Sequence, residues 1–188
     1  MRKLKIGTRG SALAVAQARL VQDAYLKRGV ESELVIVRTR GDADLSSPLS
    51  EIGRGAFTDV FSEMIASGEL DVAVHSAKDL PTDEAHDMFF CLPRADARDA
   101  LLTLAGREVL RIGTGSPRRA AAVQKLFPQA DILPVRGNVD TRIQKMLAGE
   151  YDALVLACAG LDRLGFAHPE IRVERLAPRS EEHTSELQ

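Results

Sequence analysis

The 188-residue sequence contains no tryptophan, only two cysteines and four histidines, and aromatic residues make up 4% of it. Two cysteines without a ligand spacing predict neither a disulfide framework nor a zinc site. Cys91 and Cys158 each follow apolar residues, so we expect two buried thiols. The scattered histidines likewise predict no metal site.

The sequence also lacks an excess of either charge and any long apolar run. Its net charge of −2 at pH 7 argues against nucleic acid or an anionic membrane as a partner. No apolar run approaches the roughly 20 residues that span a bilayer. Residues 1–10 contain no signal-peptide core, so we predict a cytoplasmic protein.

Apolar patterns predict strands that alternate with helices. Strands are expected at residues 3–7, 33–39 and 72–74. A first helix should begin after Ser11 as its N-cap and end at Gly29. A second helix has one apolar face over residues 57–65 and should end at Gly68. This alternation predicts an α/β protein with a mostly parallel sheet covered on both faces.

Three motifs occur twice in the same order. IGTRGS at 6–11, IVRTRGD at 36–42 and GELDVAV at 68–74 are matched by IGTGSP at 112–117, LPVRGNV at 133–139 and GEYDALV at 149–155. The offsets differ, so the pattern is not a solenoid repeat. We predict two tandem domains, residues 1–92 and 98–178, joined by a hinge at 93–97, with a ligand cleft between them.

Basic and hydroxyl side chains gather where the predicted strands end, which is where α/β sheets bind ligands. Ser116 should cap a helix that starts at Pro117, leaving backbone N–H groups for an anion. Arginine binds carboxylates and phosphates through paired hydrogen bonds, so the ligand should carry several anionic groups. The predicted binding residues are Arg9, Ser11, Lys78, Thr114, Ser116, Arg118, Arg119, Arg136, Arg142 and Arg163. The alternative for Arg118 and Arg119 is a well-capped helix with two solvated arginines.

Asp79 is an acidic residue among these basic ones, in the stretch DVAVHSAKD. It could pair with Lys78 or cap the turn that follows. Our interpretation is that a fixed carboxylate here holds an N–H group or stabilises a cation that forms during a reaction.

Together these stretches resemble the hydroxymethylbilane synthase family, also called porphobilinogen deaminase. The matching motifs run in family order from residue 4 to about residue 178: IGTRGSALA, RTRGD, GRGAF, DVAVHSAKDLPT, RIGTGSPRRAA, VRGNVDTR and YDALVLACAGLDRLG. So many ordered motifs make the resemblance specific.

The resemblance implies two domains like type II periplasmic binding proteins and a smaller third domain. It implies a monomeric transferase of porphyrin and heme biosynthesis that joins four porphobilinogen units and releases ammonia each time. A dipyrromethane cofactor, held by a cysteine of the third domain, primes the chain. By the same resemblance Asp79 is the catalytic carboxylate, and the binding residues named above hold cofactor and substrate carboxylates.

The sequence departs from the family pattern in three places. Arg54 keeps a positive charge where the family has lysine, so it could contact the ligand, but Asp59 reverses a charge nearby. Gly115 stands where the family often has serine, which removes one hydroxyl group.

The third departure follows Pro178, where the resemblance stops. Residues 179–188, RSEEHTSELQ, read as a translated sequencing-library adapter, and we expect them to be an assembly artefact. We therefore expect this chain to lack the return segment of the first domain, the third domain and the cofactor-bearing cysteine. On that expectation the chain alone neither holds dipyrromethane nor turns over porphobilinogen.

Two other functions fit the same residues. A non-catalytic two-domain module could bind a carboxylate or phosphate ligand with these arginines. A transcription effector domain of similar fold is disfavoured because no helix-turn-helix or basic arm is present. Asp79 separates the first of these from an enzyme, because a pure anion binder gains nothing from a carboxylate in its site.

Overall fold

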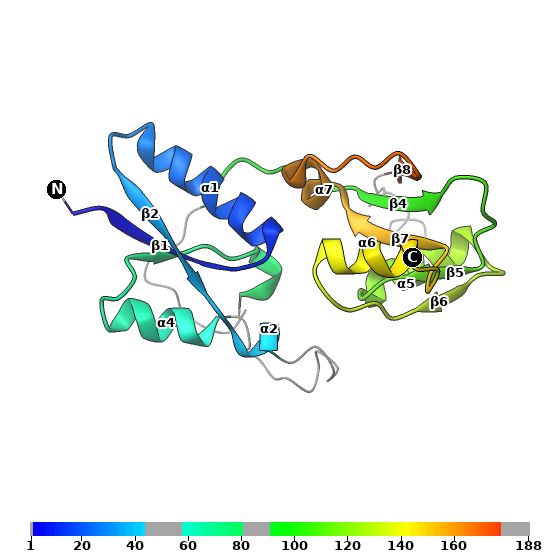
Figure 1. Cartoon of the computed structure of the whole chain (residues 1–188), viewed down its shortest axis with the longest axis horizontal. Helices are drawn as coiled ribbons and strands as arrows, with labels where there is room; N and C mark the ends of the chain where they lie inside the picture. Colours follow the sequence, from blue (N-terminus) through cyan, green and yellow to red (C-terminus); the bar gives the residue numbers. More distant parts are fainter. Residues whose placement is uncertain (1, 44–57, 81–90, 178–188) are drawn as a thin grey trace, which may run out of the picture. The chain divides into compact units, whose positions relative to one another are not determined.

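The protein is described by a computed structural model over residues 2–43, 58–80 and 91–177 (Figure 1). It consists of two compact units, Met1–Pro93 (unit 1) and Arg94–Gln188 (unit 2), and each is considered by itself. The predictions for Arg54, for the start of the second helix at Phe57 and for the tail at 179–188 lie outside the described residues.

Unit 1 has a parallel sheet with the strand order β2-β1-β3. Its elements are β1 (Leu4–Arg9), α1 (Ala12–Leu26), β2 (Ser32–Val37), α2 (Arg40–Ala43), α4 (Asp59–Ala66), β3 (Val72–Ala73) and the 3₁₀ turn η1 (Ala77–Asp79). The helices α1 and α4 lie on opposite faces of this sheet (Figure 1). Strand β1 runs two residues further than predicted, so Arg9 is its last residue and does not follow it.

Unit 2 has a mixed sheet with the strand order β6-β5-β7-β4-β8. Its elements are β4 (Asp99–Leu104), β5 (Arg111–Gly113), α5 (Pro117–Leu126), β6 (Asp131–Leu133), α6 (Val139–Leu147), β7 (Ala153–Ala157), α7 (Cys158–Leu164) and β8 (Ile171–Arg175). The strands β6, β5 and β7 are parallel, whereas β4 runs antiparallel to both β7 and β8. The predicted parallel alternation therefore holds for β5, β6 and β7 and does not include β4 and β8.

The sheet of unit 2 is buried on both faces. Alternate residues of β4 and β7, such as Leu102 and Leu154, pack with α6 and α7 on one face. Their neighbours, such as Leu101 and Val155, pack with Val123 of α5 on the other face. Burial on both faces explains the continuous apolar run ALVLA of β7. In the described part of the chain, no helix is long and apolar enough to cross a membrane.

The two units repeat one arrangement of three strands. The motif pairs found in the sequence overlap the central strands β1 and β5, the ends of the outer strands β2 and β6, and the outer strands β3 and β7. Each central strand holds a glycine against a buried side chain: a Cβ on Gly7 would lie 2.4 Å from Leu70, and a Cβ on Gly113 would lie 2.8 Å from Tyr151. The repeat therefore preserves both strand order and the close packing at the centre of each sheet.

In each of these three-stranded arrangements, a carboxylate just before an outer strand bonds to the central strand. Asp71 accepts the backbone N–H of Lys5 at 2.8 Å and donates its own N–H to the Lys5 carbonyl at 3.0 Å. Asp152 makes the same two bonds with Arg111, at 2.8 and 2.9 Å. The Arg111 guanidinium also binds Asp152, and these bonds hold the pKa of that carboxyl below its usual range despite partial burial.

The two cysteines differ from each other. Cys158 is buried at the start of α7, as predicted. Cys91 is exposed, so the prediction of a second buried thiol is wrong. Residues 91–98 form neither helix nor strand, and Cys91 belongs to none of the buried clusters despite its apolar neighbours in the sequence.

Gly7→Ala should destabilise the protein by about 1–3 kcal/mol, because overpacking a rigid core is costly. The new methyl group would meet Leu70 and Phe61, which are 2% and 1% exposed and have no room to move away. Gly10→Ala is the control, since its Cβ would lie 3.3 Å from one methyl group of Ile36, an exposed side chain. Urea unfolding measures both variants, and equal losses of stability would contradict the packing argument.

Asp152→Asn should lower stability at neutral pH and lose this effect in acid. The pKa of Asp152 is lower in the folded protein than the value of about 3.9 for an unfolded aspartate, so its ionised form stabilises the fold. This stabilisation is fully present above the unfolded pKa and is lost as the pH falls through the lower folded pKa. Urea midpoints of wild type and variant should therefore converge below about pH 4. Asp131→Asn, at an exposed position of β6, is the control. A difference that stays constant with pH would refute the charge argument.

Candidate functional site

Asp79 ends the short 3₁₀ turn η1, which follows β3 in unit 1. Its backbone N–H donates to the Ser76 carbonyl at 2.8 Å, which fixes the position of its Cα. The Asp79 side chain is 22% exposed, and the exposed ammonium of Lys78 lies 3.9 Å from its Oδ1. An exposed pair at that distance contributes little stability. The backbone of Asp79 is therefore held in place, and its carboxylate remains accessible.

The turn that carries Asp79 is anchored by residues that the sequence analysis did not single out. The Ser76 hydroxyl and the side-chain amide of Gln17 on α1 lie 3.3 Å apart in a hydrogen bond. The His75 ring meets the buried Phe61 ring edge-on, with 4.8 Å between the ring centres. Gln17 is a polar residue in the mostly apolar stretch ALAVAQARLV of α1, and this pattern could have indicated its hydrogen bond to Ser76.

The other predicted residues of unit 1 surround the end of β1. The Ser11 hydroxyl accepts the N–H of Ala14 at 3.3 Å and so caps α1, as predicted. Thr8 is fully buried and donates to the Ala14 carbonyl at 3.1 Å. Arg9 is half-buried between them. The cap therefore uses the Ser11 hydroxyl as an acceptor.

The equivalent turn of unit 2 lies between β5 and α5. Ser116 caps α5 by accepting the N–H of Arg119 at 3.4 Å, and Pro117 begins the helix, as predicted. The Ser116 N–H donates to the hydroxyl of Thr114 at 3.2 Å, and Thr114 is buried. This turn contains one residue fewer than its counterpart in unit 1.

Three predicted arginines lie close together in unit 2: Arg119, Arg136 and Arg142, called here the arginine group. Burial lowers the pKa of Arg142, and the positive charges of Arg119 and Arg136 lower it further. Arg142 is held in place by donating from Nε to the Gly137 carbonyl at 2.8 Å. The positive charges of these arginines repel one another, so an anion bound among them would reduce the repulsion.

Gly115 lies beside this group, and the Val135 carbonyl leaves little room there for a Cβ. A Cβ at this position would lie 3.8 and 3.9 Å from the two terminal nitrogens of Arg142, and 3.0 Å from the Val135 carbonyl oxygen. A side chain here would therefore lie against the Arg142 guanidinium. The glycine therefore lets the turn pack closely against the Val135 carbonyl and the Arg142 guanidinium.

Arg118 and Arg119 are paired with a residue that the sequence analysis missed. Both donate to the carboxylate of Asp99, each at 2.9 Å. Asp99 begins β4, and because β4 is antiparallel it lies opposite Ala157, the last residue of β7. The predicted site residues were those that follow strands, whereas Asp99 is the first residue of one. The alternative of two solvated arginines is wrong for Arg119, which is 18% exposed.

Arg163 is the remaining predicted residue of unit 2. It lies on α7, which follows β7 directly, and it is half-buried. It therefore lies on a different helix from Arg118 and Arg119, which belong to the first turn of α5.

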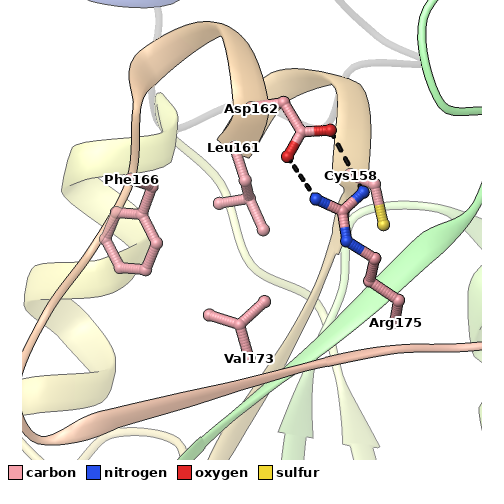
Figure 2. Close-up of a pocket in the computed structure, with 6 residues that line it drawn as sticks. All are labelled: Cys158, Leu161, Asp162, Phe166, Val173 and Arg175. Carbon is pink, nitrogen blue, oxygen red and sulfur yellow. Dashed lines mark hydrogen bonds and ion pairs between the residues drawn. The ribbon is translucent and has the colours of Figure 1, made fainter.

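A separate pocket of about 210 Å³ lies in unit 2 (Figure 2). It is lined by Cys158, Leu161, Asp162, Phe166, Val173 and Arg175, none of which is a predicted site residue. Asp162 and Asp96 both bind the Arg175 guanidinium, which raises the pKa of Arg175 and balances its charge. Burial raises the pKa of the Cys158 thiol. The pocket therefore has neither a free cation nor a reactive thiolate.

The described histidines have structural roles. His75 packs on Phe61, and Nδ1 of His168 accepts the N–H of Glu170 at 3.2 Å. Within the described ranges, no three His, Cys, Asp or Glu side chains form a group that could hold a metal ion.

The sequence is similar to one family over nearly all of its length. The matching family model is described as "Porphobilinogen deaminase, dipyromethane cofactor binding domain" and covers residues 4–183. The match thus reaches five residues past Pro178, into the segment predicted to be an adapter artefact. That assignment lies outside the described residues and stays a prediction.

Several curated relatives are named porphobilinogen deaminase. That of Corynebacterium efficiens is 47% identical over 169 residues, which is 86% of this chain and 56% of the relative. That of Mycolicibacterium gilvum is 44% identical and covers 93% and 58%. That of Leifsonia xyli subsp. xyli is 48% identical and covers 86% and 52%. The chain spans about half the length of these relatives.

Solved structures support the predicted fold class. An ancestral cationic amino acid solute binding protein matches with a TM-score of 0.54 at 15% identity, over 92% of this chain and 76% of that protein. At this identity the likeness shows the fold alone. It confirms an α/β architecture of the periplasmic-binding-protein kind.

Arg142→Gln should weaken the stabilisation that a polycarboxylate gives the protein. A ligand at 100 times its Kd adds about 2.7 kcal/mol, and a tenfold loss of affinity removes about 1.4 kcal/mol of binding energy. The measurement is the rise in unfolding temperature with citrate at constant ionic strength. Arg172→Gln is the control, because Arg172 is an exposed arginine on β8. Equal losses in the two variants would show general screening and no site at the arginine group.

Proposed function

Because this chain belongs to the porphobilinogen deaminase family, we propose that it supplies the substrate-binding and catalytic residues of a hydroxymethylbilane synthase. Such an enzyme joins four porphobilinogen units head to tail and releases one ammonia with each. The chain spans about half the length of its relatives, so the activity of the whole enzyme is part of the proposal. A monomeric, cytoplasmic enzyme with no nucleic-acid or membrane partner is the accompanying expectation.

The arginine group is the observation on which this proposal depends. Each pyrrole carries an acetate and a propionate, so a chain of pyrroles is a polyanion. Three arginines that repel one another, one of them partly desolvated, suit such a ligand because its carboxylates would offset the repulsion.

The same residues fit the dipyrromethane cofactor, which also carries pyrrole carboxylates. When bound, it supplies the pyrrole end to which the next unit is joined. Arg118, Arg119, Arg136 and Arg142 would hold its carboxylates. Thr114 and Ser116 shape the turn before α5, whose positive dipole end favours an anion.

Asp79 is the proposed catalytic residue. When the C–N bond of porphobilinogen breaks, the protonated amino group of the aminomethyl side chain leaves as ammonia with the bonding electrons, and the pyrrole becomes an electron-poor cation. A carboxylate that accepts the pyrrole N–H stabilises this charge as it develops. The backbone bond from Asp79 to Ser76 and the Ser76–Gln17 contact hold the turn before the reaction begins. Lys78 is mostly exposed and 3.9 Å away, so it leaves the Asp79 oxygens accessible.

A binding module without catalysis is the second candidate function. The arginine group would serve it equally well, because anion binding needs only donors and positive charge. Asp79 supports the enzyme instead, because a carboxylate that does not orient a binding arginine repels an anionic ligand unless a cation forms beside it.

Asp79→Asn should reduce turnover of porphobilinogen by about 10²–10³-fold, the usual cost of losing one electrostatic stabiliser. The enzyme for this test carries residues 4–177 of this chain in place of the matching part of the Corynebacterium efficiens relative. Formation of hydroxymethylbilane is the measurement, and circular dichroism checks the fold. Asp23→Asn, an exposed aspartate on α1, is the control. Undiminished turnover by Asp79→Asn would assign the reaction to another group, and binding without turnover by the unmutated enzyme would favour the binding module.

A further inference from the structure

We propose that Asp99 is a positioning residue, whose carboxylate orients the guanidinium groups of Arg118 and Arg119 for binding substrate carboxylates. This inference rests on the proposed function, because it requires these two arginines to bind the pyrrole chain. Asp99 is the first residue of β4, and its side chain is 15% exposed. It is therefore mostly shielded from water without being part of the apolar core.

Each oxygen of Asp99 accepts a hydrogen bond from a different arginine. Oδ1 accepts from Nε of Arg119, and Oδ2 accepts from Nη2 of Arg118, both at 2.9 Å. A guanidinium carries five N–H donors in one rigid plane. One bond to a fixed oxygen therefore restricts the plane of each arginine while its remaining donors can serve a ligand. Among the described residues, neither side chain makes another hydrogen bond to protein.

The fold fixes the carboxylate before any ligand binds. The Asp99 carbonyl accepts the N–H of Leu176 at 2.9 Å, and β4 is paired with β7 on one side and β8 on the other. The arginines come from the first turn of α5, which Ser116 caps. A strand and a helix start thus hold the two ends of the same ion pairs. Ordering long side chains in advance reduces the entropy that ligand binding must cost.

From charge alone, removal of the Asp99 carboxylate would strengthen substrate binding, whereas the positioning role predicts weaker binding. A negative charge beside the arginine group repels an anionic substrate, so its removal would tighten binding if charge were all that mattered. If Asp99 orients the arginines, its removal weakens binding although the net positive charge increases. The direction of the change therefore separates the two roles.

The test uses the full-length enzyme described above, with Asp99→Asn and Asp99→Glu. We expect Asp99→Asn to raise KM for porphobilinogen about tenfold, because the arginines lose their fixed acceptor. Asp99→Glu keeps the charge and should raise KM less. The matched control is Asp152→Asn, which removes a carboxylate from another arginine of unit 2 and should lower stability without changing KM.

The outcomes are distinct. KM does not depend on how much of the enzyme is folded, so a less stable Asp99→Asn variant still gives a clear result below its unfolding temperature. An unchanged or lowered KM in Asp99→Asn would overturn the inference, as would a KM for Asp99→Glu above that of Asp99→Asn. Absence of turnover by the enzyme that retains Asp99 would instead refute the proposed function.

Discussion

Two carboxylates, Asp71 and Asp152, form reciprocal hydrogen bonds with Lys5 and Arg111, near the starts of the strands β1 and β5. These bonds set the register of β3 on β1 and of β7 on β5. A slip of one residue would turn every side chain to the other face of the sheet. Everything that follows the strands, including the turn with Asp79 and the start of α7, depends on this register.

The central glycines add a second constraint at the same place. With no side chain on Gly7 or Gly113, Leu70 and Tyr151 pack directly on the backbone of the central strands. The aspartate that ends each of the sequences GELD and GEYD bonds to the central strand, and the Leu or Tyr before it packs on the central glycine. These two contacts explain why similar sequences follow the helices α4 and α6. The recurring motifs in the sequence are therefore first of all features of folding.

Much of this was predictable from local signals. The caps at Ser11 and Ser116, the parallel order of the repeated strands and the burial of Cys158 follow from short-range patterns that the structure confirms. Asp99 was not predictable in this way, because its proximity to Arg119 arises from an antiparallel strand pairing between distant segments. Cys91 shows the converse, since apolar neighbours in sequence do not ensure a place in a core.

The two turns that follow the central strands differ although the strands match. Arg9 and Gly10 separate Thr8 from Ser11 in unit 1, whereas Gly115 alone separates Thr114 from Ser116 in unit 2. The hydrogen bonds and packing that hold each sheet involve the strands themselves. The groups available to a ligand lie in the turns that follow the strands and in the helix starts after those turns. Exchanging these turns between the two units would change the groups offered to a ligand and would leave the hydrogen bonds and packing of each sheet in place.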